Sequence, residues 1–418
     1  MDPSNNYPQG IHSLAITDSS SSSSRPLAQD NMSTMCLEEL PYDVRHSILS
    51  SVDTVADLLI FVQASPVFYR DYAIEPERWL YHCLGLELGH GIIDAVTVHL
   101  AKTFTCRQDR TMDEVHRTME DIRQFISSYH SCISSLTRPN SVLPNKADII
   151  SMVAFHLTVV MPLVSRFIEW TQSHFRALSL PDGLSHTEMK RIFRGFYRYQ
   201  LFCNIFGPNE QTLQPWISAD EKLEWFFSIF EPWETEEILC VYQFISDKYQ
   251  KVRNEQWWYG TGILTDINQP GLSSLGLTFL LTLFKTDDQK TLSNLILQNT
   301  SRLYYAPWVA EAVTRACQVR RLNLVFSARD RAQAEREPMP FMGDNEDSPP
   351  LAWVTIWKGT YSNLFGQWIP RSFLRWGYVM WDSDRIVSTG AIAALEEKWV
   401  EACTIPSTDL FVDPRSRV

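Results

Sequence analysis

The sequence predicts a mainly α-helical protein, with a short three-helix N-terminal module followed by a large non-repetitive helical domain. Apolar residues recur at helical spacing over most of the 418 residues, whereas the alternation typical of strands is scarce. No internal repeat indicates a solenoid or a propeller. Hydrophobic residues make up 44% of the chain and charged residues 21%, a balance that is ordinary for a protein with a packed core.

The first segment, residues 1–34, is polar and contains six consecutive serines, Ser19 to Ser24. Such a segment buries too little apolar area to offset the entropy of ordering, so we expect a disordered tail. It has neither a basic start nor an apolar stretch, and therefore does not resemble a signal peptide. We expect a cytoplasmic or nuclear protein.

The pattern of residues 35–80 predicts three short helices. The first begins near Pro41, whose missing N–H costs nothing at that position, and carries an apolar stripe that ends at Val52. The second follows a capping signal, Thr54 with Asp57 three residues later. Ser65-Pro66 ends it, because the residue before a proline avoids helical geometry, and a third helix bears Phe68.

The remaining residues, 81–418, form the predicted helical body. The first helix of the series is predicted to begin at Pro76. The periodicity predicts helices over residues 76–88, 113–131, 146–177, 185–206, 219–230, 233–255, 272–284, 289–304 and 306–325. Residues 329–350 are charged and rich in proline, which predicts a long exposed loop.

Charge and cysteine content narrow the functional classes. The net charge is −12, which disfavours attraction to nucleic acids and anionic membranes, so we expect neither as a partner. The eight cysteines are isolated and indicate small buried side chains in a reducing compartment. The uncharged stretch from Ile149 to Ser165 is short for a membrane span and has helical periodicity, so we expect a buried core helix.

Motifs for catalysis are nearly absent, and we expect no enzyme, no cofactor and no metal. The stretch from Tyr259 to Asp266 contains Gly-x-Gly but lacks the third glycine of a dinucleotide-binding loop. His82 beside Cys83, and His130 near Cys132, lack a second pair that would complete four metal ligands. Isolated core cysteines and partly exposed histidines explain both pairs better.

Two charged groups of residues could face each other. A basic stripe (Lys190, Arg191, Arg194 and Arg198) lies on the helix predicted over 185–206, and an acidic group (Glu231, Glu234, Glu236 and Glu237) follows it. We expect these groups to pair within the fold. The alternative is that the stripe binds an acidic peptide.

Tryptophans are concentrated near the C-terminus. Six of them lie between Trp353 and Trp399, and we expect a compact aromatic core because each ring brings a large apolar area to bury. The alternative is a small-ligand or enzyme site in this half. That site would use Tyr259, Asp266, Trp357 and Asp382.

Residues 37–72 resemble an F-box. The family pattern has Leu-Pro, apolar residues on a first helix, a break, a second apolar helix and Ser-x-x-aromatic, and Ser65 with Phe68 completes it here. Three later stretches, FRGFYRYQLFCNIFG, EPWETEEILCVYQFI and RSFLRWGYVMWD, are similar to those of fungal F-box-like proteins. The chain departs from better-known members because Phe68 replaces the usual tryptophan and no propeller or leucine-rich repeat follows.

The resemblance implies an adaptor that binds the Skp subunit of a cullin ubiquitin ligase and recruits a substrate protein through the helical body. Recognition of this kind uses apolar anchors at helical spacing. The implied partner-binding residues are Leu40, Pro41, Val44, Ile48, Leu49, Leu58 and Val62. The alternative is a structural or interaction protein outside the ligase, whose F-box-like helices pack against its own body.

Overall fold

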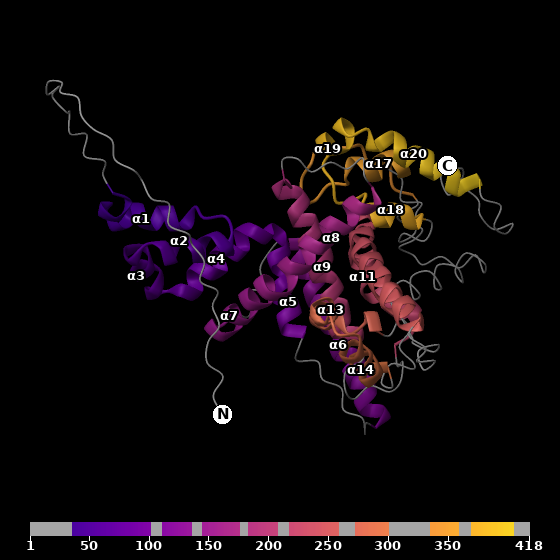
Figure 1. Cartoon of the computed structure of the whole chain (residues 1–418), viewed down its shortest axis with the longest axis horizontal. Helices are drawn as coiled ribbons and strands as arrows, with labels where there is room; N and C mark the ends of the chain where they lie inside the picture. Colours follow the sequence, from indigo (N-terminus) through magenta and orange to yellow (C-terminus); the bar gives the residue numbers. More distant parts are fainter. Residues whose placement is uncertain are drawn as a thin grey trace, which may run out of the picture.

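The computed structural model describes residues 36–101, 111–135, 144–175, 183–207, 217–258, 272–300, 335–358 and 369–404. Within these ranges the regular elements are helices and none is a strand, so the predicted mainly α fold is confirmed. Helices α1 to α3 form one end of the molecule, and the C-terminal helices lie towards the opposite end (Figure 1).

The N-terminal module contains η1 (Leu37–Glu39), α1 (Tyr42–Ser50), α2 (Val55–Ala64) and α3 (Pro66–Ile74). The cap expected at Thr54 is present, and Ser65 adds one that the sequence did not indicate. Thr54 Oγ1 accepts the N–H of Asp57 at 3.1 Å and starts α2. Ser65 is extended, ends α2 and caps α3, where its Oγ accepts the N–H of Phe68. Helix α4 (Pro76–Leu88) contacts α1, α2 and α3 on one side and α7 and α9 on the other, so it crosses the predicted boundary at residue 80.

The body continues from η2 (Gly89–Gly91) into α5 (Ile92–Ala101) and α6 (Met112–Ser135). A long helical segment follows. It consists of α7 (Lys146–Phe155), a π-helical turn η3 (His156–Val160) and α8 (Met161–His174). Pro162 lies in the first turn of α8, directly after the π turn. The π-helix is rare and occurs mostly as a single turn of this kind inside an α-helix.

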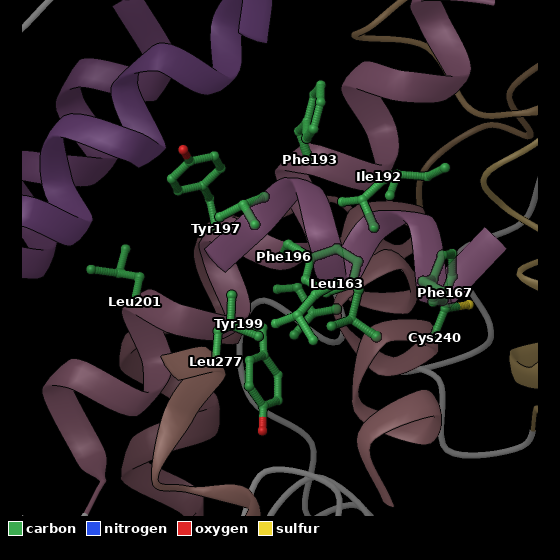
Figure 2. Close-up of a cluster of buried hydrophobic side chains, with 14 of the residues drawn as sticks. Leu163, Phe167, Ile192, Phe193, Phe196, Tyr197, Tyr199, Leu201, Cys240 and Leu277 are labelled. Atoms are coloured by element: carbon green, nitrogen blue, oxygen red, sulfur yellow. The ribbon is translucent and has the colours of Figure 1, made fainter. Parts of the chain in front are cut away.

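Helix α9 (His186–Phe206) is the centre of the core, with 14 of its 21 residues buried. It packs against α4, α5, α8, α11 (Pro232–Trp258) and α13 (Gly276–Lys285). Figure 2 shows side chains of α8, α9, α11 and α13 meeting around Phe196 and Leu163. Gly195 lets α9 approach α11 closely, because a Cβ there would lie 3.1 Å from the carbonyl oxygen of Glu237.

Shorter helices complete the body. These are α10 (Ala219–Trp225), η4 (Phe227–Ile229), α14 (Gln289–Thr300), α17 (Leu351–Trp357), α18 (Arg371–Trp376), α19 (Ser383–Ser388) and α20 (Ala391–Thr404). The helices predicted from 76 to 304 are found where the structure describes them, but the one over 219–230 divides into α10 and η4, and the one over 146–177 contains the π turn η3. The prediction over 306–325 and the tail 1–34 lie outside the described residues.

Candidate functional site

The structure divides the seven implied partner-binding residues into two groups. Pro41 is exposed, Val44 is 42% exposed, and Leu40 and Ile48 are partly buried. The other three, Leu49, Leu58 and Val62, are at most 2% exposed and belong to the module's own core. The side of α1 that carries Val44 is therefore exposed, whereas the apolar face of α2 holds the module together.

Polar contacts fix the shape of this surface. Arg45 Nε lies 2.7 Å from Asp71 Oδ2 and ties α1 to α3, and its Nη1 donates to the carbonyl of Leu40 at 2.5 Å. Ser65 Oγ donates to Glu38 Oε1 at 2.5 Å. The turn from Leu40 to Pro41 is thus held against α1 and α3 without using Val44.

A buried contact joins the module to the body. Glu87 Oε2 accepts the N–H of Val55 at the start of α2 at 3.1 Å, and its Oε1 lies 3.1 Å from His156 Nε2. His156 is fully buried in the π turn, with Nδ1 3.1 Å from the hydroxyl oxygen of Tyr197. A Glu–His–Tyr group resembles proton-transfer machinery, but His156 has no exposed surface where a substrate could meet it. Its geometry is that of a structural link.

A pocket of about 380 Å³ lies where the module meets α7. Its walls include His46 and Ser50 of α1, Trp79 and His82 of α4, and Ile149 of α7. At least one polar group of the pocket wall already has a partner within the fold. His82 Nε2 lies 3.0 Å from the carbonyl oxygen of Ser50. No pattern in the sequence indicates this pocket, because its walls come from three separate helices.

The C-terminal half of the basic stripe pairs within the fold, as predicted. Arg194 donates to both oxygens of Glu237 at 2.6 and 2.7 Å, and Arg198 Nη1 lies 2.9 Å from Glu234 Oε1. Arg198 Nε also contacts Asp94 Oδ2 at 3.2 Å, and that carboxylate accepts the hydroxyl of Tyr129 at 2.5 Å. The carboxylates of Asp94 and Glu237 are nearly inaccessible to solvent.

The pKa values in this cluster reflect a balance between burial and pairing. Burial raises the pKa of Glu237 in spite of the opposing effect of Arg194. Burial would also raise the pKa of Glu234, but Arg198 and Arg194 outweigh it, so that pKa is lowered. Burial raises the pKa of Asp94 although Arg198 opposes the shift. These groups support the fold, and the guanidinium groups of Arg194 and Arg198 are both paired with internal carboxylates.

The N-terminal half of the stripe has partners that the sequence did not indicate. Lys190 Nζ contacts Glu346 Oε1 at 2.5 Å, and Arg191 Nη1 donates to Asp382 Oδ1 at 2.8 Å. Residues 335–350 of the predicted loop contain no helix, yet they are not simply exposed, because Asp344 and Glu346 lie against α9. Residues 329–334 lie outside the described ranges.

The tryptophans between Trp353 and Trp399 that the structure describes lie in a core, whereas Trp368 lies outside the described residues. The rings of Trp353, Trp357, Trp381 and Trp399 are at most 1% exposed, and Trp357 packs edge to face on Trp399 at 5.0 Å. Trp357 Nε1 donates to the hydroxyl of Tyr378. This packing is that of the predicted aromatic core.

Of the residues named for a ligand site there, the two that the structure describes have contacts within the fold. Trp357 is fully buried, and the Asp382 carboxylate is occupied by Arg191 and by the hydroxyl of Ser185. Tyr259 and Asp266 lie outside the described residues.

The histidine and cysteine pairs have structural contacts. Cys83 Sγ donates to the carbonyl of Val52, and burial raises its pKa to about 11. Cys132 is partly buried, without a disulfide. Across the described residues, no three His, Cys, Asp or Glu side chains are grouped as metal ligands would be.

Two helical stretches are long and apolar enough to cross a membrane by composition alone. They are Pro76–Ala101 and Lys146–His174, and within their most apolar windows 61% and 44% of the residues are buried inside the protein. The second contains the predicted core helix. Val160, Leu163 and Phe167 in this stretch are fully buried, because α9 and α13 pack against it.

No model of a known protein family matches the chain, and no curated protein or solved structure matches it either.

Proposed function

We propose that the chain is a non-enzymatic adaptor, which binds the Skp subunit of a cullin ubiquitin ligase through its N-terminal module and a substrate protein through its body. The observation that carries this proposal is a concentration of exposed apolar side chains. Six of the thirteen large hydrophobic residues that are exposed in the described ranges lie between Leu37 and Ile74. A contiguous exposed apolar patch is typical of an interaction site, and Val44 of this group belongs to the surface that we assign to the adaptor.

The surface that we assign to the adaptor is Leu40, Pro41, Val44 and Ile48. These residues belong to the turn before α1 and to the side of α1 that carries Val44, and a short amphipathic helix of this type fits helix-in-groove recognition. The rival in which these helices are covered by the protein's own body is less favoured, because α1 contacts α3 and α4 and Val44 stays 42% exposed.

Binding between the full-length chain and a recombinant Skp subunit tests the proposal. We expect Val44→Asp to weaken binding at least about tenfold, because a charge would be buried at the interface. Leu40→Asp combined with Ile48→Asp should abolish it. Val387→Asp is a matched control, since Val387 is a 60% exposed valine on α19 in the body.

Melting temperatures separate contact from folding. Val44→Asp should leave the melting temperature close to that of the wild type, because the side chain contributes little to the core. A wild-type chain that does not bind the Skp subunit would reject the adaptor function. Binding that survives both Val44→Asp and the double variant would show that the surface is wrongly assigned.

A further inference from the structure

An acidic segment of the chain, Gly343 to Asp347, lies on the N-terminal half of α9; we call it the strap. Glu346 Oε1 contacts Lys190 Nζ at 2.5 Å, and Asp344 Oδ1 lies 3.5 Å from Arg191 Nη2. Asp347 Oδ1 lies 3.2 Å from His90 Nδ1. Each carboxylate of the strap therefore has a basic or imidazole partner, over a distance in sequence of about 150 residues or more.

The main chain of the strap is recognised as well. Arg194 Nη1 donates to the carbonyl of Glu346 at 2.6 Å, and Arg191 Nη2 donates to the carbonyl of Asn345 at 3.4 Å. A free carboxylate or phosphate ion has no such peptide carbonyls. Contacts to both the side chains and the backbone fit an extended peptide.

The receiving surface is shaped around the Glu346 carboxylate. The N–H of His90 donates to Glu346 Oε2 at 3.0 Å, just after Gly89. Gly89 has a φ of +57°, and a Cβ at this position would lie 2.5 Å from Glu346 Oε1. Burial alone would raise the pKa of Glu346, but the hydrogen bonds from Lys190 and the His90 N–H outweigh it and lower the pKa. The carboxylate is thus held ionised in a close-fitting site.

The strap can leave without stranding a buried charge. Arg191 would keep Asp382, and Arg194 would keep both oxygens of Glu237. The more exposed Lys190, whose side chain is 25% exposed, is the cation that would lose its ion pair. A buried guanidinium without a counter-ion would be costly, so the two internal carboxylates make an exchange of occupants feasible.

The strap is also fixed unevenly at its two ends. Gly343 has a φ of +94°, a Cβ added to it would meet nothing within 4 Å, and Met342 before it is 70% exposed. On the other side, Pro349 and Pro350 are buried and lead into α17. Glu346 and Asp347 can therefore leave α9 and His90 while Asp344 stays bound to Ser383 and Pro349 stays in place.

We propose that Gly89, His90, Lys190, Arg191 and Arg194 form a binding site for an acidic peptide segment, that the strap occupies this site in cis, and that an acidic segment of a partner replaces it. The site lies in the body and does not depend on the adaptor contact of the module. A tethered segment has an effective concentration of the order of millimolar, so the strap limits access to partners that are tight or locally concentrated.

A peptide-binding experiment with the full chain tests this proposal. The probe is a fluorescein-labelled synthetic peptide with the sequence of residues 341–349, FMGDNEDSP. The strap variant carries Glu346→Lys and Asp347→Lys, which expel the strap through repulsion by Lys190. Asp344 is kept, because its Oδ2 accepts the N–H of Ser383 and so supports the start of α19.

Fluorescence anisotropy should show that the strap variant binds the peptide at least about tenfold more tightly than the wild type, which has the tethered competitor. Adding Lys190→Ala to the strap variant should weaken binding at least about fivefold, because one charge-assisted contact is lost. In a control peptide, glutamine replaces Glu346 and asparagine replaces Asp347. The strap variant should bind this control peptide as weakly as the wild type binds the probe. Circular dichroism and melting curves confirm that each variant is folded.

A folded strap variant that binds the probe no better than the wild type would overturn the proposal, and so would equal binding of the control peptide. If the strap variant does not fold, hydrogen exchange of the wild type with millimolar peptide gives the answer. Displacement should speed exchange at the N–H groups of Asp347 and Ser348, which donate to Asn345 Oδ1 in the strap. Unchanged exchange at saturating peptide would reject the proposal.

Discussion

The replacement Arg194→Met tests a buried bidentate ion pair of the fold. The guanidinium is 6% exposed and bonds both oxygens of Glu237, which is completely buried. Methionine would fill much of the volume but leave the Glu237 carboxylate buried without its cation. Removing one partner of such a buried pair lowers the free energy of unfolding by about 3–5 kcal/mol. At about 2 °C per kcal/mol for a large chain, the melting temperature should fall by roughly 6–10 °C.

The loss should depend on pH in a defined direction. Without Arg194, burial raises the pKa of Glu237 further above its value in the unfolded chain, so the folded variant binds a proton that the unfolded chain releases. The stability of the variant is then retained at low pH and is lost as the pH rises through the folded pKa. The deficit relative to the wild type should therefore be larger at pH 7.5 than at pH 5.

Two controls make the assay decisive in thermal unfolding followed by circular dichroism. Lys190→Met removes a partly exposed ion pair with Glu346, and such pairs contribute about 0–1 kcal/mol. Arg194→Met combined with Glu237→Met replaces the buried pair with apolar side chains and should recover most of the loss. The reasoning is refuted if Arg194→Met melts within 2 °C (about 1 kcal/mol) of the wild type, or if the double variant is no more stable than the single one.

Two further predictions concern other buried groups. Burial lowers the pKa of Lys222 from 10.5 to about 8. The buried ammonium therefore reduces the free energy of unfolding by its full amount below pH 8, and this reduction disappears as the pH approaches 10.5. Lys222→Met should raise the free energy of unfolding at pH 7, by at most about 3 kcal/mol, and the gain in urea unfolding should shrink towards pH 10. The second prediction is that a maleimide at pH 8 labels the exposed Cys36 first. The buried Cys83, whose pKa is raised to about 11, should react only after unfolding. Peptide mapping by mass spectrometry measures both labelling rates, and equal rates would contradict the prediction.

Helix boundaries were predictable because their signals are local. Helix α4 begins with Pro76 in its first turn, and α9 begins at the Ser185–Glu188 capping box. Each of these signals spans at most four residues, and both helices begin where the signals predict. The π turn at His156 was not predicted. Periodicity cannot distinguish one inserted residue from continuous helix when apolar residues lie on both sides, as they do from Val153 to Leu163.

Contacts between distant segments could be predicted only in part. Opposite charge on two helices indicated the pairing of Arg194 and Arg198 with Glu234 and Glu237. Charge alone could not select Glu346, more than 150 residues away, as the partner of Lys190, because many exposed carboxylates would serve equally. The same limit applies to Glu87, whose position between Val55 and His156 depends on how α2, α4 and η3 pack together.

The side of α1 that we propose as the adaptor surface follows from the geometry of a nine-residue helix. Val44 and Ile48 are four residues apart and share one side, while Leu49 points into the module, which also buries Leu58 and Val62 of α2. A substitution at Leu58 would change adaptor binding through the folding of the module, because that side chain has no exposed surface. Only a substitution on the Val44 side can separate contact from stability, and the Arg45–Asp71 pair keeps that side in place while it is tested.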